Sequence, residues 1–118
     1  MSGNRDWIFR VQDMIDNIDF IKTNLKDVDR DSFSQQDVLR RAIERSFEII
    51  GEAARFIPQD IQQKYSDVEW SDIIGMRHKI SHDYLEISPQ TLWDIYNNDF
   101  FGLEKKLQTI LNQEDTQS

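Results

Sequence analysis

The stretch WIFRVQDMIDNIDFIKTNLKDV, residues 7–28, decides the fold class of this chain. Its apolar residues recur at spacings that alternate between four and three, which is typical of a helix with one apolar seam. The seam consists of Trp7, Val11, Met14, Ile18, Ile21, Leu25 and Val28. This spacing predicts a long helix whose seam lies in the core of a helical bundle. A self-associating coiled coil would have the same spacing, so both interpretations stay open at this point.

Three more segments carry apolar residues at helical spacing. The first begins at Ser34, as its N-cap, and ends at Pro58. The second begins at Ser71, and the third begins at Ser88-Pro89, a pair typical of a helix N-terminus. A short helical turn is also expected at residues 59–65. No segment alternates between apolar and polar residues as strands do, so the fold class is predicted to be all-α.

The length of 118 residues suits one domain with a modest core. We predict an up-and-down bundle of four to five helices that occupies residues 1–112, followed by a disordered tail at residues 113–118. Gly51 lies inside the first of the three later helices, where glycine costs about 1 kcal/mol relative to alanine. It predicts a close helix–helix contact, either within the bundle or across a dimer interface.

Composition and charge limit the function classes. The chain has no cysteine, which excludes disulfides and thiolate metal sites. No apolar run approaches the ~18 residues of a membrane span, so we expect a cytoplasmic protein with no membrane partner. The net charge of −8 opposes broad binding of nucleic acid, although one cleft can still concentrate positive charge, and an acidic face could dock a basic partner. Basic residues gather in the middle of the chain: Arg40, Arg41, Arg45, Arg55, Arg77, His78 and Lys79.

The stretch WSDIIGMRHKISHDY, residues 70–84, contains both histidines. Arg77, four further residues and then His82 and Tyr84 form an Arg-x4-His-x-Tyr pattern. An arginine clamps phosphate oxygens bidentately, and an imidazole can take and give a proton near neutral pH. A continuous helix would place Arg77 and His82 about 140 degrees apart. Either the helix therefore ends near Ser81, or a second copy of the chain completes the site across a twofold axis.

Other side chains have two interpretations. His78 and His82 are spaced i,i+4 and could share a metal ion, but the stretch lacks His-Glu-x-x-His and thiolates, so neither a metal nor a cofactor is expected. Glu52 could orient a site arginine or could form an ordinary charge pair. Trp70 and Trp93 could stack on bases, although in so small a domain a core position is favoured.

Two separate motifs carry a resemblance to a known family. The Arg-x4-His-x-Tyr pattern, preceded by Trp70 and Ile73-Ile74-Gly75-Met76, resembles the signature of the HepT-like toxins of the HEPN superfamily. The segments Arg41-Ala42-Ile43-Glu44-Arg45 and Ile49-Ile50-Gly51-Glu52-Ala53 are similar to the second helix of that family. The likeness covers nearly the whole chain. His78 departs from it, because relatives often carry asparagine there.

The resemblance implies a HEPN-like bundle and the toxin of a toxin–antitoxin pair. It implies a metal-independent endoribonuclease that works as a homodimer on RNA, with Arg77 and His82 as catalytic residues. His78, Lys79 and Tyr84 would bind the substrate. A minimal nucleotidyltransferase, the cognate antitoxin, would silence the protein by transferring AMP to Tyr84. The alternative is a non-catalytic nucleotide-binding or substrate-binding companion of a nucleotidyltransferase. Independently of the function, the Tyr84 hydroxyl could simply cap a helix end.

Overall fold

The computed structural model describes residues 5–81 and 87–115. This part of the chain folds into six α-helices and contains no strand, which confirms the predicted all-α class. The helices are α1 (Trp7–Leu25), α2 (Arg30–Ser34), α3 (Asp37–Arg55), α4 (Gln59–Lys64), α5 (Trp70–Ser81) and α6 (Pro89–Asp115). The four long helices are those that the apolar spacing predicts. Helix α4 confirms the short helical turn expected at residues 59–65. The number exceeds the expected four to five because α2, which the sequence did not predict, is a further short helix.

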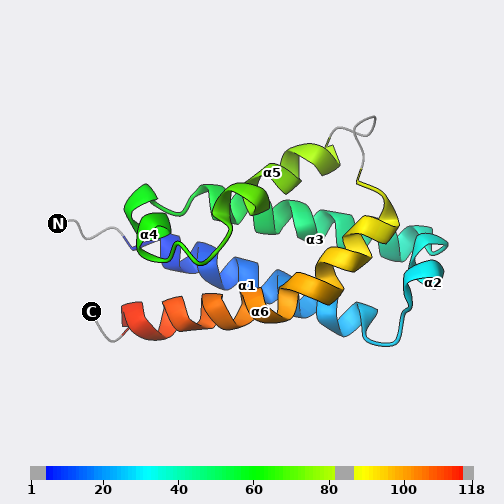
Figure 1. Ribbon diagram of the computed structural model, residues 1–118, viewed down its shortest axis with the longest axis horizontal. Helices are drawn as coiled ribbons and strands as arrows, with labels where there is room; N and C mark the ends of the chain where they lie inside the picture. The colour runs from blue at the N-terminus through cyan, green and yellow to red at the C-terminus, as the bar shows by residue number, and fades with distance from the viewer. Residues whose placement is uncertain (1–4, 82–86, 116–118) are drawn as a thin grey trace.

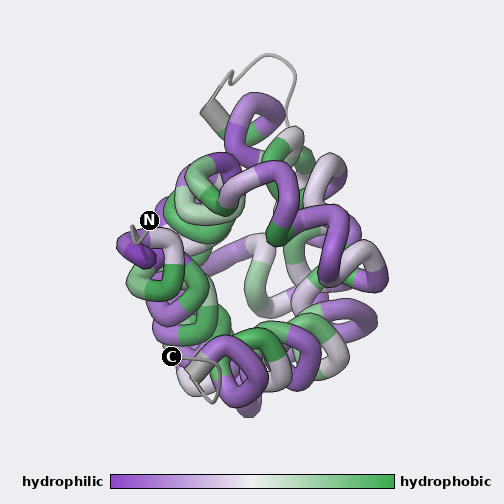
Figure 2. Tube along the Cα trace, turned by 90° about the vertical axis from the view of Figure 1, so that its left-hand side faces the viewer, coloured by the Kyte–Doolittle hydropathy of each residue, from purple (hydrophilic) through white to green (hydrophobic). Residues whose placement is uncertain are grey.

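The long helices alternate in direction, as Figure 1 shows, so the first and last described residues lie at the same end of the molecule. Helix α3 packs against both α1 and α5, and α1 packs against α6. The helical turns in Figure 2 carry both hydrophobic and hydrophilic residues, as expected where one face of a helix is buried. The predicted up-and-down bundle is therefore confirmed.

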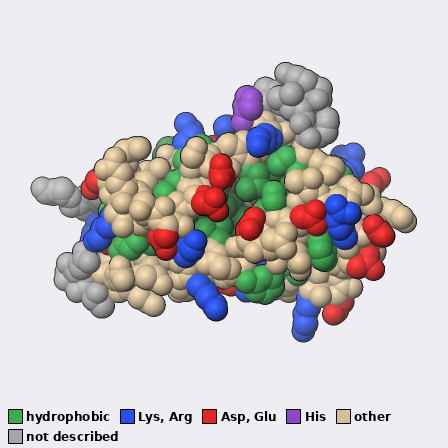
Figure 3. Space-filling model, viewed as in Figure 1, with side chains coloured by type: hydrophobic (Ala, Val, Ile, Leu, Met, Phe, Trp, Pro, Cys, Tyr) green, Lys and Arg blue, Asp and Glu red, His purple; other side chains and the backbone are tan. Residues whose placement is uncertain are grey.

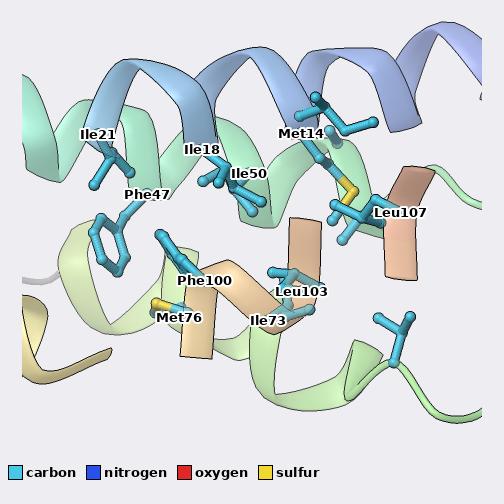
Figure 4. Packing of buried hydrophobic residues seen from close by; sticks show 14 of the residues in the cluster. Met14, Ile18, Ile21, Phe47, Ile50, Ile73, Met76, Phe100, Leu103 and Leu107 are labelled. Atoms are coloured by element: carbon cyan, nitrogen blue, oxygen red, sulfur yellow. The ribbon is translucent and has the colours of Figure 1, made fainter. Parts of the chain in front are cut away.

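The seam of α1 lies in the core of this bundle. Six of its residues are buried, and Val28 packs against them from the edge. Buried side chains of α3 and α6 meet the seam, among them Phe47, Ile50, Phe100 and Leu107, as Figure 4 shows. Each such side chain stabilises the fold by about 1.5–3 kcal/mol through removal of its apolar surface from water. The bundle-core interpretation of the seam is confirmed.

Two helix ends differ from the sequence predictions. Ser34 does not cap α3, because it ends α2, where its hydroxyl donates to the carbonyl of Asp31 at 2.8 Å. Helix α6 continues beyond residue 112 to Asp115. Glu114 in this last turn is buried and accepts hydrogen bonds from the Tyr65 hydroxyl at 2.6 Å and from Lys64 Nζ at 2.9 Å. These bonds hold the end of α6 against α4, which local sequence could not predict.

Gly51 brings α3 and α5 into close contact. A Cβ atom at this position would lie 2.9 Å from the carbonyl oxygen of Ile73 and 3.0 Å from the Cβ of Arg77. The close contact that Gly51 predicts is thus confirmed, and it lies within the bundle. Because the first of these atoms belongs to the backbone of α5, the glycine sets how closely Arg77 approaches α3.

Replacing Gly51 with alanine is expected to lower the free energy of unfolding by up to about 2 kcal/mol. Overpacking costs about 1–3 kcal/mol, and the better helix propensity of alanine offsets about 1 kcal/mol of it. Urea denaturation measures the change. Gly75→Ala is the matched control, since a Cβ there meets no atom within 4 Å. A Gly51→Ala protein as stable as Gly75→Ala would contradict this account of the contact.

Candidate active site

The structure describes the first part of the predicted motif. Arg77, His78 and Lys79 lie on the C-terminal half of α5, whose described part ends at Ser81. His82 and Tyr84 lie outside the described residues, so their positions relative to Arg77 stay predictions. The geometry below therefore concerns Arg77 and its neighbours.

Arg77 is held by a carboxylate of the neighbouring helix α3. Its Nε atom lies 2.6 Å from Oε1 of Glu52. The other oxygen of Glu52 accepts a hydrogen bond from Arg55 Nη2 at 2.9 Å. Both roles considered for Glu52 are therefore present, because it pairs with an arginine on its own helix and also orients Arg77. The second pairing depends on the close approach of α5 at Gly51.

The negative charge of Glu52 suits it to orient Arg77. The hydrogen bond from Arg55, together with the positive charges of Arg55, Arg77 and Arg10, lowers the pKa of Glu52 below its usual value. The carboxylate therefore stays ionised at neutral pH and attracts the guanidinium of Arg77 throughout that range. Its Oε1 atom is buried, and the Nε–H bond of Arg77 does not point along the line between the two atoms, so the contact is an ion pair rather than an aligned hydrogen bond.

Much of the Arg77 guanidinium is available to a ligand. The side chain is 46% exposed. Among the residues that the structure describes, no hydrogen bond occupies either terminal nitrogen. These nitrogens present the parallel N–H groups that bind two oxygens of one phosphate. A guanidinium fixed through Nε and open at its other end is well placed to bind a phosphodiester.

Arg77 opens onto a cleft between α1, α3 and α5, with a volume of about 430 Å³. Three basic and three acidic residues line it, so the cleft carries no net charge within a chain whose net charge is −8. The lining residues are Arg10, Asp13, Arg45, Glu48, Ile49, Glu52, Ala53 and Arg77. Sequence reasoning missed Arg10, because nothing in its local pattern shows that α1 passes beside Arg77. The cleft combines cations suited to phosphate with an acidic partner that orients one of them.

Exposed aromatic and apolar side chains also occur on α1 and α3, the two helices that carry most of the cleft lining. Phe9 on α1 is 70% exposed and Val38 on α3 is 85% exposed. Phe56, at the end of α3, is 48% exposed and lies under the guanidinium of Arg10, whose Cζ is 4.3 Å from the ring centre. Side chains of this size are normally covered, so the face formed by α1 and α3 is suited to contact with another surface.

The other described candidates do not line the cleft of Arg77. His78 and Lys79 are exposed, and Lys79 lines a separate groove between α5 and α6 rather than the cleft. Trp70 is buried and donates to the carbonyl of Tyr65 at 3.0 Å, and Trp93 packs against the core and donates to the carbonyl of Val28 at 2.9 Å. The core interpretation of both tryptophans is thus confirmed.

Over residues 5–81 and 87–115, no three His, Asp or Glu side chains gather closely enough to hold a metal ion. No helix in that part of the chain combines the length and apolar character that a membrane span requires.

Residues 14–110 match the protein family described as "Ribonuclease HepT-like". "Putative RNase TTE0752" of Caldanaerobacter subterraneus is 33% identical over 104 residues, which cover 88% of this chain and 93% of the relative. "Putative RNase MJ1380" of Methanocaldococcus jannaschii is 31% identical over 108 residues, or 92% and 99% of the two chains. "Probable ribonuclease HepT" of Thermococcus cleftensis is 26% identical over 100 residues, or 85% and 91%. No solved structure matches this chain.

Proposed function

This chain belongs to the ribonuclease HepT-like family of the HEPN superfamily, and we propose on that premise that it is a metal-independent endoribonuclease, the toxin of a toxin–antitoxin pair. The observation that carries the proposal is Arg77, fixed by Glu52 through Nε and open at its terminal nitrogens. It stands in a cleft with two more arginines, Arg10 and Arg45. This arrangement suits a phosphodiester substrate such as RNA.

In the proposed reaction, a 2′-hydroxyl of RNA attacks the adjacent phosphorus and the bond to the 5′-oxygen breaks. His82 takes the proton of the 2′-hydroxyl or supplies one to the leaving 5′-oxygen. Arg77 donates to the phosphate oxygens and stabilises the negative charge that grows on them in the transition state. His78 and Tyr84 contact the RNA beside the reacting phosphate. Lys79 lines the groove between α5 and α6 rather than the cleft of Arg77, so it takes no part in the proposed reaction. The products end in a 2′,3′-cyclic phosphate and a free 5′-hydroxyl.

We expect the working unit to be a homodimer. The exposed side chains of Phe9, Val38 and Phe56 support a second copy packed on the face of α1 and α3. All lining residues of the cleft except Arg77 come from α1 and α3, so a twofold axis at these helices would bring two such clefts close together. His82 of one copy could then act with Arg77 of the other.

Cleavage by the purified protein tests the proposed reaction. EDTA is expected to leave the rate unchanged, because the donor groups are an arginine and an imidazole rather than a set of carboxylate ligands. Analysis of the cut ends should show 2′,3′-cyclic phosphate and 5′-hydroxyl. His82→Ala should bind the same RNA without cutting it. Ends with 5′-phosphate would contradict the mechanism, and wild-type binding without cleavage would favour the non-catalytic companion.

Tyr84 is the residue at which the cognate minimal nucleotidyltransferase should silence the protein. Tyr84 lies two residues after His82 in the sequence. AMP on its hydroxyl would add a negatively charged phosphodiester, and this group would compete with RNA for Arg77. Intact-mass measurement after incubation with that partner and ATP tests this. Each AMP adds about 329 Da to the wild type. Tyr84→Phe should gain no mass, and an equal gain on this variant would refute the assignment.

A further inference from the structure

A second hollow lies on the molecule, away from Arg77. It is a groove of about 750 Å³ between α5 and α6. Its floor is apolar and consists of Ile73, Met76, Phe100 and Leu103, which are buried and converge from the two helices in Figure 4. Figure 3 looks onto this face and shows hydrophobic side chains in the hollow, with charged side chains around it. No residue that lines this groove also lines the cleft of Arg77.

Two glycines line the groove, and no contact within the described chain requires a glycine at either position. Gly75 lies on α5 and Gly102 on α6, and a Cβ at either position would meet nothing within 4 Å in the described structure. Gly51 differs, because α5 occupies the space where its Cβ would be. A helix is less stable with glycine in its interior than with alanine. A helical glycine whose Cβ position is empty therefore suggests that something outside the chain approaches it closely. Here two such positions open onto the same groove.

The charges on the rim indicate what kind of surface approaches. Glu69, Asp72 and Asp99 line the groove, and no hydrogen bond or ion pair joins their carboxylates to other described residues. Two lysines also line the groove: Lys106 donates to the carbonyl of Asp67 at 2.8 Å, and Lys79 is exposed. The three carboxylates therefore leave the rim with a net negative charge. Unpaired carboxylates repel the phosphates of RNA and attract lysine or arginine side chains. They also disfavour a second copy of this acidic chain.

We propose that the groove between α5 and α6 binds an amphipathic helix of a partner protein. The apolar face of that helix would cover the half-buried Ile87 and Ile95, which line the groove above its buried floor, as in other helix-in-groove complexes. Its backbone would pass close to Gly75 and Gly102, and its basic side chains would pair with the three rim carboxylates. This docking site is distinct from the ribonuclease site and does not depend on RNA cleavage.

Binding of a designed peptide tests the site. The probe is a fluorescently labelled helical peptide of about 18 residues, with leucine and alanine on one face and lysine on the other. Fluorescence anisotropy with the full-length protein should show saturable binding. Gly75→Leu and Gly102→Leu, which fill the groove, should each raise the Kd at least about tenfold. Equal Kd values for these variants and the wild type would overturn the proposal.

Charge reversal separates docking from general attraction of a basic peptide to an acidic protein. Asp72→Lys combined with Asp99→Lys should raise the Kd about tenfold or more. The matched control is Asp16→Lys combined with Asp31→Lys, which changes the net charge equally on α1 and α2. An equal loss of binding in the control would overturn the proposal, as would displacement of the peptide by a labelled RNA oligonucleotide.

Thermal stability tests whether Gly75 and Gly102 are needed for partner binding rather than for the fold. Gly75→Ala and Gly102→Ala should each raise the Tm of the isolated protein by about 2–6 °C, because alanine favours the helix and its Cβ meets no atom. The same variants should bind the peptide more weakly. A lower Tm would show a structural role and refute the argument. Sedimentation should find the same oligomeric state for Gly75→Leu and the wild type, since a changed state would make the groove a contact between copies.

Discussion

Replacing Arg77 with alanine is expected to lower RNA cleavage by about 10²–10³-fold, the usual effect of removing one donor to a transition-state anion. The side chain is 46% exposed, so the fold should survive the change. Arg77→Lys should recover only part of the rate, because lysine keeps the charge but lacks the parallel N–H groups. Initial rates on a labelled RNA, with circular dichroism as the folding check, measure these effects. Full activity in Arg77→Ala would remove this residue from the mechanism.

Glu52→Gln provides the companion measurement for the positioning of Arg77. Glutamine keeps the shape of Glu52 but removes the charge that attracts the guanidinium 2.6 Å away. We expect a loss of about tenfold in cleavage rate, because misplacement of a catalytic group is costly. In the double variant with Arg77→Ala, Glu52→Gln should cost nothing more, since residues that act through one another are not additive. Independent, multiplying losses would mean that Glu52 acts by another route.

Mixing two inactive proteins should restore activity if the site draws on both copies of a homodimer. Arg77→Ala and His82→Ala chains, mixed in equal amounts, form mixed dimers in about half of all pairings. Each mixed dimer would contain one site with an intact Arg77 and an intact His82 from opposite chains. The mixture should therefore reach about one quarter of wild-type activity at the same total concentration.

The control for this experiment mixes Arg77→Ala with the double variant Arg77→Ala/His82→Ala. No pairing there contains an intact arginine, so no activity should return. Each single variant is also assayed unmixed. An absence of recovery in the main mixture, with subunit exchange shown by mass spectrometry, would place Arg77 and His82 of each site on the same chain. A fully active monomer would contradict the dimer itself.

The sequence alone determined the fold class and the motif. Helical periodicity is local, because residues three and four apart share one face, and the α1 seam from Trp7 to Leu25 therefore predicted its own burial. The Arg-x4-His-x-Tyr pattern is also local, so it identified Arg77 without any structure. Gly51 predicted a close helix contact through the cost of glycine in a helix, although it could not tell which helix made the contact.

Only the tertiary structure decided what surrounds Arg77. Glu52, Arg10 and Arg77 come from three helices that are distant in the sequence, and their meeting depends on how α1, α3 and α5 pack. Packing also separated Lys79 from Arg77, although the two are close neighbours along α5. The groove between α5 and α6 arises in the same way. Periodicity shows which face of a helix is apolar, but the geometry of packing determines which face of which partner covers it and which surface stays open.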